Sequence, residues 1–264
     1  MAIETYPDQL EPTNPEVVIW RFMKMARFAD LVKTGELYFR RADLFNDEHE
    51  GLPPEEYLCY CFGLNRLLLS DRRTLNNHLG NLAQFRESFY ISCWHLFRSE
   101  TDKMWSEYGN DGVAICSRYS LLKSALGAMG EGAFLGLVRY GAKHLTGYNL
   151  FRFITTKQAK FKDEQEVRAM LWIMDPHATI NRHVDEQNRP HPRPLTEPLG
   201  DSVLDGQRRR VDLQTLITEI VVTPWASPAT FDEVNWLVNS SGYTIPIRPS
   251  GLAPYRDLLP STAR

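Results

Sequence analysis

The sequence predicts a single α+β domain over residues 1–264, with a central, mostly antiparallel sheet flanked by helices. Strand-forming runs rich in β-branched and aromatic residues begin near Val17, Leu37, Phe89, Val113, Leu135, Val167 and Ile220. Helical segments of unequal length separate these runs, whereas a doubly wound parallel sheet needs a regular alternation. A chain of this length fits one large domain, and no internal repeat divides it.

The first elements follow from apolar patterning and from a helix-stopping glycine. Val17–Phe22 predicts a strand in which Arg21 is the only charged member. Lys24–Thr34 predicts a helix that ends at Gly35, because glycine readily adopts the left-handed conformation found at helix ends. Glu36–Arg41 then predicts a second strand.

An acidic turn follows over Ala42–Gly51. Asp43 is placed to cap a short turn through Phe45. Asp47 and Glu50 are placed to hold a neighbouring arginine or a metal ion, although their spacing does not fit an EF-hand loop.

The rest of the chain alternates between helical and extended patterns. In order it predicts broken helices over Pro53–Leu82, a strand over Ser88–His95, a short helix over Thr101–Gly109 capped by Thr101, a strand over Val113–Cys116, a helix over Tyr119–Met129, a strand over Ala133–Tyr140, a helix over Leu150–Ala159, and a short helix and strand over Arg210–Val222. Residues 175–206 are polar and proline-rich, so they predict a long loop or insertion. Thr230 is placed to cap a helix over Phe231–Ser240, and Pro246 marks Thr244–Ile247 as an edge strand.

Composition narrows the class of protein. The net charge of −3 gives no overall attraction to nucleic acid or membrane. No apolar run approaches the roughly 20 residues of a membrane span, and the N-terminus lacks the basic and apolar regions of a signal peptide. The four cysteines, Cys59, Cys61, Cys93 and Cys116, match no common zinc pattern. We therefore expect a cytoplasmic protein with reduced thiols, no membrane contact and no resident metal.

The most informative stretch is Lys160–Trp172, which begins as a charged cluster and ends as an apolar run. In an extended conformation Glu164, Glu166 and Arg168 share one face, and the apolar residues between them face a core. Two carboxylates beside a guanidinium suit a site that binds a cation or a hydroxyl-rich ligand, or one that stabilises a positive transition state. A structural ion pair between Glu166 and Arg168 explains the same pattern.

Two further pairs are candidate site residues. Trp105 and Tyr108 lie three residues apart on a predicted helix, where they form either core or the wall of a pocket for a flat ring. Ser92 and His95 form a serine–histidine pair of the kind used by hydrolases. However, residues three apart on a strand point to opposite faces. The nucleophile-elbow motif Gly-x-Ser-x-Gly is also missing here.

Several sequence blocks together resemble a large bacterial family of uncharacterised proteins. The blocks are Leu37-Tyr38-Phe39, Phe45-Asn46-Asp47 with Glu50-Gly51, Phe89-Tyr90-Ile91-Ser92, Met104-Trp105-Ser106-Glu107-Tyr108 with Gly112-Val113-Ala114-Ile115, and Lys162 with Glu164-Gln165-Glu166-Val167-Arg168. The likeness spans about Val17 to Gly251, and it names no reaction.

The order Arg21, Ser92 and Glu164-Gln165-Glu166 also resembles ADP-ribosyltransferases of the Arg-Ser-Glu type. That resemblance implies an enzyme that uses NAD as a substrate and transfers ADP-ribose to an unidentified macromolecule, as a toxin or an antiviral-defence effector. The middle motif departs from the family, because Ile91-Ser92-Cys93 stands where Ser-Thr-Ser is usual.

The same resemblance implies a role for each site residue. Arg21 holds a phosphate or ribose of the nucleotide, and Ser92 supports the site. Glu166, with Glu164 beside it, stabilises the cationic centre that forms as nicotinamide leaves. Trp105 or Tyr108 stacks on the nicotinamide ring, and Arg168 contacts the nucleotide from the face that carries the glutamates.

Two other classes of function stay open. One is a metal-dependent nuclease or hydrolase built on Asp47, Glu50, Asp163, Glu164 and Glu166. The other is a non-catalytic module whose aromatic and acidic face binds a protein. The sequence lacks the strongly basic patch typical of nucleic-acid enzymes, and it lacks the glycine-rich phosphate loop of a kinase or a dinucleotide-binding fold.

Overall fold

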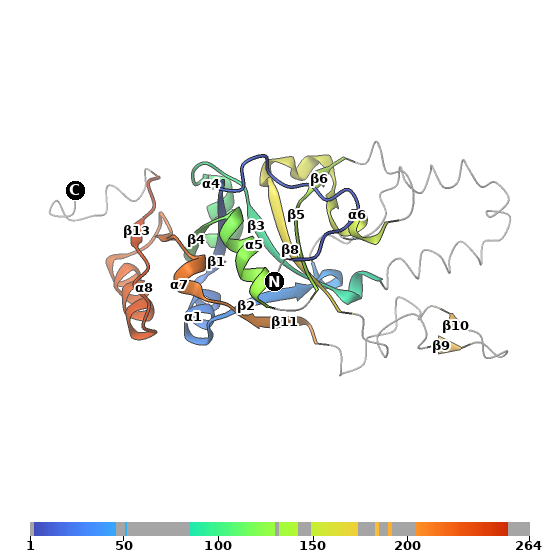
Figure 1. Ribbon diagram of the computed structural model, residues 1–264. Helices are drawn as coiled ribbons and strands as arrows, with labels where there is room; N and C mark the ends of the chain where they lie inside the picture. The colour runs from blue at the N-terminus through green and yellow to red at the C-terminus, as the bar shows by residue number, and fades with distance from the viewer. Residues whose placement is uncertain are drawn as a thin grey trace.

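A nine-stranded sheet organises the chain in the computed structural model, which describes residues 3–45, 51, 85–129, 132–141, 149–173, 183–184, 190–191 and 204–252 (Figure 1). Its strands are β1 (Val18–Lys24), β2 (Glu36–Arg41), β3 (Phe89–His95), β4 (Gly112–Arg118), β5 (Ala133–Leu137), β8 (Glu166–Trp172), β11 (Gly206–Arg210), β12 (Glu219–Val222) and β13 (Ile247–Pro249). Two small two-stranded sheets pair β6 (Arg139–Tyr140) with β7 (Thr156–Lys157), and β9 (His183–Val184) with β10 (Pro190–His191). Within the nine-stranded sheet every pairing is antiparallel except that of β12 with β13. The predicted α+β class with a mostly antiparallel sheet is therefore confirmed.

Short helices connect the strands. They are α1 (Met25–Thr34), α4 (Asp102–Met104), α5 (Tyr119–Ala128), α6 (Leu150–Ile154), α7 (Leu213–Leu216) and α8 (Pro228–Ser240). Three 3-10 turns, η1 (Ala42–Leu44), η3 (Arg86–Ser88) and η5 (Ala159–Glu164), and a π-helical turn, η4 (Trp105–Gly109), complete the described elements. In the part of the chain that the structure describes, no helix has both the length and the apolar character needed to cross a membrane.

The sheet branches at β3. β8 pairs with the whole length of β3 along one edge. The other edge is shared, because β2 pairs with Tyr90 and Ile91 near the start of β3, and β1 pairs with His95 at its end. β1 and β2 therefore diverge from a common neighbour and leave a gap between them. Arg21 bridges this gap by donating a hydrogen bond to the carbonyl of Tyr38 (3.1 Å).

The register divides polar residues between two faces of β3. His95 lies opposite both Trp20 of β1 and Glu166 of β8, so these three side chains share a face. We call it the site face, and on β3 it carries Phe89, Ile91, Cys93 and His95. The opposite face, which we call the core face, carries Tyr90, Ser92 and Trp94.

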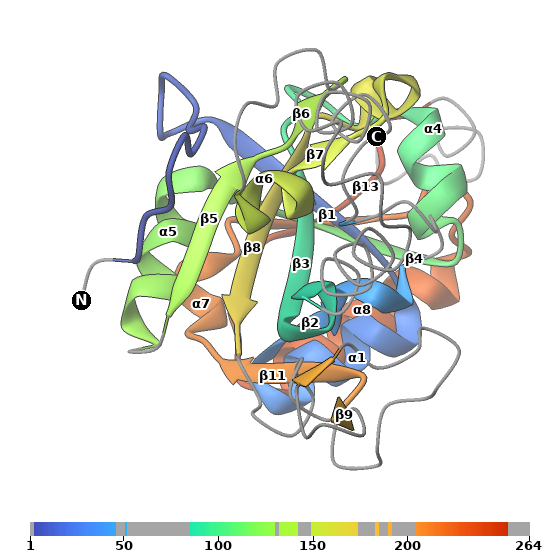
Figure 2. The same ribbon diagram turned by 90° about the vertical axis from the view of Figure 1, so that its right-hand side faces the viewer.

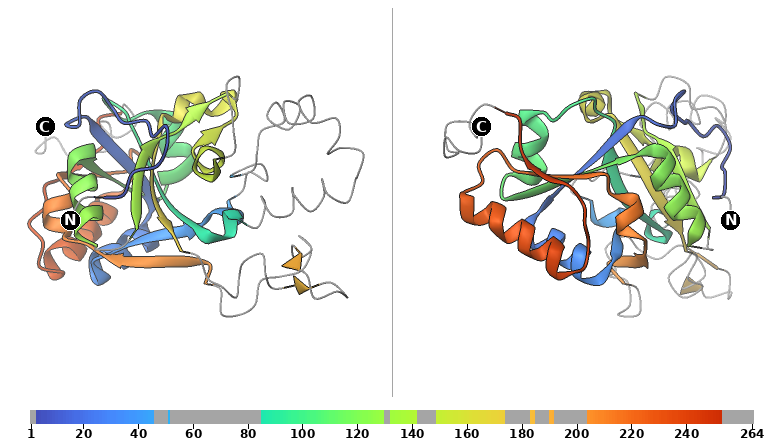
Figure 3. Two further views of the ribbon diagram at one scale, coloured as in Figure 1. Left: turned by 45° about the vertical axis from the view of Figure 1, so that its right-hand side comes forward. Right: turned by 60° about the vertical axis from the view of Figure 1, so that its left-hand side comes forward.

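The core face holds the largest apolar cluster. Helices α1, α5, α7 and α8 cover it, with α1 beside α8 and α5 beside α7 (Figure 3). Fully buried side chains such as Phe28, Trp94 and Ile115 meet there. Burial of each such side chain stabilises the fold by about 1.5–3 kcal/mol.

The site face holds two smaller apolar clusters, one around Phe89, Phe151 and Met170 and one around Phe22 and Trp105. Figure 2 looks onto this face and shows α6 in front of β8. The register places Arg168 beside Cys93 and Glu166 beside His95, between the two clusters. A charged stretch of β8 thus lies on a largely apolar face.

Helix ends follow local chemistry, with two corrections to the prediction. Gly35 ends α1 in the left-handed conformation (φ 69°), and Thr101 accepts a hydrogen bond from the Met104 N–H, both as predicted. The α8 cap is Ser227 rather than Thr230, because Pro228 starts the helix one turn earlier and the Ser227 hydroxyl accepts from the Thr230 N–H. Asp43 does not cap η1; its carboxylate instead pairs with Arg41 at 2.6 Å.

Some predicted boundaries shift, and some segments lie outside the described residues. The helix predicted to Ala159 ends at Ile154, where the chain turns into β7 and then η5. The last strand begins at Ile247, after Pro246, and lies at the sheet edge as predicted. Asp47, Glu50, the helices over 53–82 and most of the 175–206 insertion lie outside the described residues.

Candidate functional site

Four charged side chains meet on the site face where β8 begins. The Lys157 ammonium lies between two carboxylates, 2.8 Å from Glu164 Oε2 and 2.9 Å from Glu166 Oε2. Arg168 donates two hydrogen bonds to the Glu166 carboxylate, one from Nε at 2.7 Å and one from Nη2 at 3.1 Å. The cluster is a buried chain of alternating charge.

The chain reverses sharply to bring these groups together. Glu164 ends η5, and Gln165 then adopts a left-handed conformation (φ 41°) that is uncommon for a residue with a side chain. β8 starts at the next residue, so Glu164 and Glu166 reach the same place from a helical turn and from a strand. The Glu166 N–H donates to the Tyr140 hydroxyl (2.7 Å), which holds the start of β8 against β6.

The electrostatics of the cluster keep Glu166 charged. Burial alone raises the pKa of a carboxyl, but Arg168 and then Lys157 outweigh it and hold the pKa of Glu166 well below its usual range. Arg168 also donates from Nη1 to the Ile154 carbonyl and is completely buried. A buried ion pair with its donors and acceptors satisfied in this way keeps a single geometry.

An aromatic wall stands beside the carboxylates. The Tyr108 hydroxyl donates to Glu164 Oε1 at 3.5 Å, the outer limit for a hydrogen bond, and the Tyr108 side chain is 40% exposed. Its ring lies 5.7 Å from the His95 ring, which in turn stacks on Phe97 at 5.9 Å. Burial, followed by the charge of Glu164, raises the pKa of Tyr108, so its hydroxyl stays protonated at neutral pH.

Cys93 and His95 complete the site face of β3. Burial, and then the charge of Glu166, raises the pKa of the Cys93 thiol well above its usual value, so the thiol is a poor nucleophile. His95 Nδ1 donates to the Glu164 carbonyl (2.9 Å). Burial lowers the pKa of His95 despite the nearby Glu166 and Glu164, so the ring is neutral at pH 7.

The structure brings four of the seven predicted site residues together: Tyr108, Glu164, Glu166 and Arg168. Tyr108 and Glu164, which are in contact, are 56 residues apart in the sequence. Trp105 lies near them but is completely buried, edge-on to Phe22 and donating to Glu100 at 2.9 Å. It therefore presents no free face to a ligand, and the predicted stacking role is left to Tyr108.

The structure does not bring Arg21 and Ser92 to this cluster. Both belong to the opposite side of the sheet, because alternation along β1 and β3 places them with Trp94 rather than with His95. The Arg21 guanidinium lies 5.9 Å from the centre of the Trp94 ring, and burial lowers its pKa to about 10. Ser92 is buried, and its hydroxyl has no hydrogen-bond partner among the described residues. The sheet thus separates these two residues from the two glutamates.

The arrangement of Asp163, Glu164 and Glu166 does not support the metal alternative. Asp163 points outward, 80% exposed, and pairs with Lys103 at 3.7 Å. The place between Glu164 and Glu166, where a divalent cation would bridge them, is filled by the Lys157 ammonium. Among the described residues no three histidine, cysteine or acidic side chains gather as metal ligands.

Sequence reasoning missed three residues of the site: Lys157, Tyr140 and His95. Lys157 was placed in a helix, and Tyr140 only at the end of a strand. His95 was considered solely as a partner for Ser92. Alternation along the strand shows that His95 and Cys93 share a face. It does not show that His95 lies opposite Glu166, because that depends on the register between β3 and β8.

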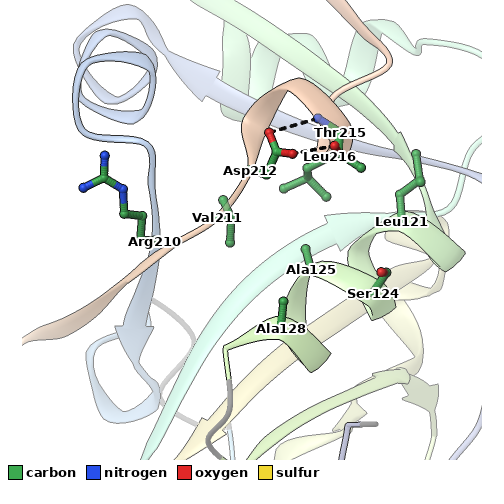
Figure 4. A pocket seen from close by; sticks show the side chains of 9 residues that line it. All are labelled: Leu121, Ser124, Ala125, Ala128, Arg210, Val211, Asp212, Thr215 and Leu216. Atoms are coloured by element: carbon green, nitrogen blue, oxygen red, sulfur yellow. Dashed lines mark hydrogen bonds between the residues drawn. The ribbon is translucent and has the colours of Figure 1, made fainter. Parts of the chain in front are cut away.

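A groove of about 500 Å³ lies elsewhere, between α5 and the segment that joins β11 to α7 (Figure 4). It is lined by Leu121, Ser124, Ala125, Ala128, Arg210, Val211, Asp212, Thr215 and Leu216. Asp212 is already engaged there, since it caps α7 and accepts from the Thr215 hydroxyl at 2.6 Å. None of the predicted site residues lines this groove.

Comparison of this chain with protein-family models, with curated proteins and with solved structures finds no match. The two family resemblances stay predictions.

Proposed function

We propose that this protein is a NAD-consuming enzyme with an ADP-ribosyltransferase-like fold, and that the cluster around Glu164 is its active site. The observation that carries the proposal is the pair of lysine-bridged carboxylates beside a half-exposed tyrosine ring. Such a pair suits a substrate that is rich in hydroxyls and becomes positively charged as it reacts. A ribose that loses nicotinamide is a substrate of this kind.

Glu164 is the carboxylate that serves the substrate. Glu166 has both oxygens engaged by Arg168 and Lys157, so it positions the lysine. Glu164 has one oxygen on Lys157 and the other only in the long contact to Tyr108. A ribose hydroxyl that replaces the tyrosine hydroxyl gains a shorter bond to Glu164 at little cost.

Tyr108 supplies the surface for the nicotinamide ring. It is the most exposed ring at the cluster, and a planar cationic ring is attracted to an aromatic face. When the bond between nicotinamide and ribose breaks, the developing charge on the ribose lies next to Glu164. Consumption of NAD in this way fits the toxin or defence role that the sequence resemblance implies.

The test is nicotinamide release from NAD by the purified full chain, comparing wild type with Glu164→Gln. Glutamine keeps the size and removes the charge, so we expect a loss of roughly 100- to 1,000-fold in kcat. Asp163→Asn is the matched control: the same chemical change on the neighbouring residue, which is 80% exposed. We expect that variant to keep the wild-type rate.

Two results would overturn the proposal. One is a folded wild type that neither binds nor consumes NAD. The other is a Glu164→Gln variant that releases nicotinamide as fast as Asp163→Asn. Thermal unfolding of all three proteins separates loss of chemistry from loss of fold.

A further inference from the structure

We infer that the acceptor in this reaction is water and that His95 is the base that activates it, so that the enzyme hydrolyses NAD. This inference rests on the proposed function and deepens it. It assigns a catalytic role to His95, which lies on β3 directly beside Glu166 of the neighbouring strand β8.

The orientation of the His95 ring is set by one hydrogen bond. The Glu164 carbonyl can only accept, so His95 Nδ1 carries the hydrogen at 2.9 Å. In the neutral ring the lone pair then lies on Nε2. A histidine held in this way by a backbone carbonyl is oriented to accept a proton at a fixed position.

The second nitrogen of His95 has no competing partner in the part of the chain that the structure describes. No hydrogen bond to Nε2 occurs among the described residues, and Nε2 is not among the fully enclosed polar atoms that lack a partner, unlike Ser92 Oγ and Trp94 Nε1. Nε2 is therefore not fully sealed from solvent. The Tyr108 ring lies 5.7 Å from the His95 ring.

The groups around His95 favour a neutral base. The titratable and charged side chains that face it are Cys93, Tyr108, Lys157, Glu164, Glu166 and Arg168. Burial disfavours the imidazolium and Lys157 adds to this, while Glu166 and Glu164 oppose it, and the net effect is a lowered pKa. The two carboxylates also stabilise the imidazolium once it has taken a proton.

The burial of His95 points to water rather than a macromolecule. His95 is only 6% exposed, and the rings of Phe22, Phe97 and Tyr108 contact it at the end of β3. A protein side chain carried on a folded surface needs more room than this to reach Nε2. Water fits, as does any small nucleophile of similar size.

The proposed step is hydrolysis of the bond between nicotinamide and ribose in NAD. The bond between ribose C1′ and the nicotinamide nitrogen breaks, and its electron pair leaves with nicotinamide, which becomes neutral. A water oxygen forms the new bond to C1′, and its proton passes to His95 Nε2 and then to solvent. The products are nicotinamide, ADP-ribose and one proton, with Glu164 offsetting the charge on the ribose.

The experiment compares His95→Asn with wild type in the full chain. The asparagine amide keeps a donor near the Nδ1 position for the Glu164 carbonyl and removes the Nε2 acceptor. We expect kcat to fall about 100-fold or more with little change in the KM for NAD. In wild type we expect an acid limb in kcat/KM that lies at lower pH than the ordinary histidine value of about 6.5, because burial lowers the pKa of His95 and protonated His95 cannot accept a proton. We expect this acid limb to vanish in the variant.

Azide separates a base from a merely structural residue, since it attacks C1′ without losing a proton. We expect added azide to restore nicotinamide release by His95→Asn and to divert the product to ADP-ribosyl azide, but not to rescue Glu164→Gln.

Wild-type rates in His95→Asn, an unchanged acid limb, or loss without azide rescue would each overturn the inference while leaving NAD consumption intact. A wild type that consumes no NAD overturns both proposals, and ADP-ribose bound to added protein in place of free ADP-ribose overturns water as the acceptor.

Discussion

Buried polar groups on the two faces of β3 differ in whether they have hydrogen-bond partners. On the site face, Glu166 and Arg168 are fully buried, yet each makes several charge-assisted hydrogen bonds. On the core face, Ser92 Oγ and Trp94 Nε1 are equally buried and have no hydrogen-bond partner. Arg21, beside them, has no carboxylate partner among the described residues and bonds only to a backbone carbonyl.

The difference follows from what lies over each face. The core face of β3 is covered by helices that present apolar side chains, so Ser92 Oγ and Trp94 Nε1 find no hydrogen-bond partner there among the described residues. The site face at the start of β8 is bordered instead by η5 and β7, which bring Glu164 and Lys157 from outside the sheet. Polar residues on one strand are thus paired or unpaired according to their neighbours, and the paired face is the one that carries the candidate chemistry.

The largest expected effect is on the paired face. Arg168→Met keeps the volume and removes the charge, so that Lys157 is the one cation left beside the buried Glu166 among the described residues. We expect the free energy of unfolding to fall by about 3–5 kcal/mol, measured by urea denaturation. Arg208→Met is the control, because Arg208 forms an exposed pair with Asp30 whose loss is expected to cost within about 1 kcal/mol. Equal losses in the two variants would show that the buried cluster is not rigidly paired.

A smaller effect is expected where β1 and β2 diverge. Arg21→Met removes the bond to the Tyr38 carbonyl and the contact with the Trp94 ring, so we expect a loss of about 1–2 kcal/mol in the free energy of unfolding. The KM for NAD should stay within about twofold, because the sheet separates Arg21 from Glu164, and a shift of this size is well under 1.4 kcal/mol. A tenfold rise in that KM in a folded variant would restore the nucleotide-holding role that the sequence suggested.

The smallest effect is expected at Ser92. Its hydroxyl has no partner, so Ser92→Ala should leave the free energy of unfolding within about 0.5 kcal/mol of wild type, or raise it. Ser117→Ala is the matched comparison, since the buried Ser117 hydroxyl donates to the Leu216 carbonyl at 2.6 Å, and its loss should cost about 1–3 kcal/mol. If Ser92→Ala proves the more damaging of the two, or abolishes nicotinamide release, the core face holds a polar role that the structure does not reveal.

Local patterns predicted much of the fold. The β2 strand was predicted with its observed bounds, and the Gly35 stop of α1 and the Thr101 cap of α4 were also correct. These features depend on residues within one turn or one strand, where propensity and capping chemistry operate. The errors arose where two local signals competed. Ser227-Pro228 outcompeted Thr230 as a helix start, and Asp43 paired with Arg41 instead of capping a turn.

The candidate site was predicted only in part. The alternation of Glu166 and Arg168 on one face followed from strand periodicity. Glu164 joined them by a different route, since it ends η5 and reaches the cluster through the reversal at Gln165.

Residue order and periodicity were sufficient to establish the fold class, most strand positions and the charged start of β8, because each depends on neighbours along the chain. Strand pairing and the packing of distant segments settled the rest. The register of β8 on β3 put His95 opposite Glu166, and β7 brought Lys157 between the glutamates. The register of β1 on β3 put Arg21 on the other face. A shift of one residue in register exchanges the two faces of a strand, and local sequence carries no information about which register wins when both faces are buried.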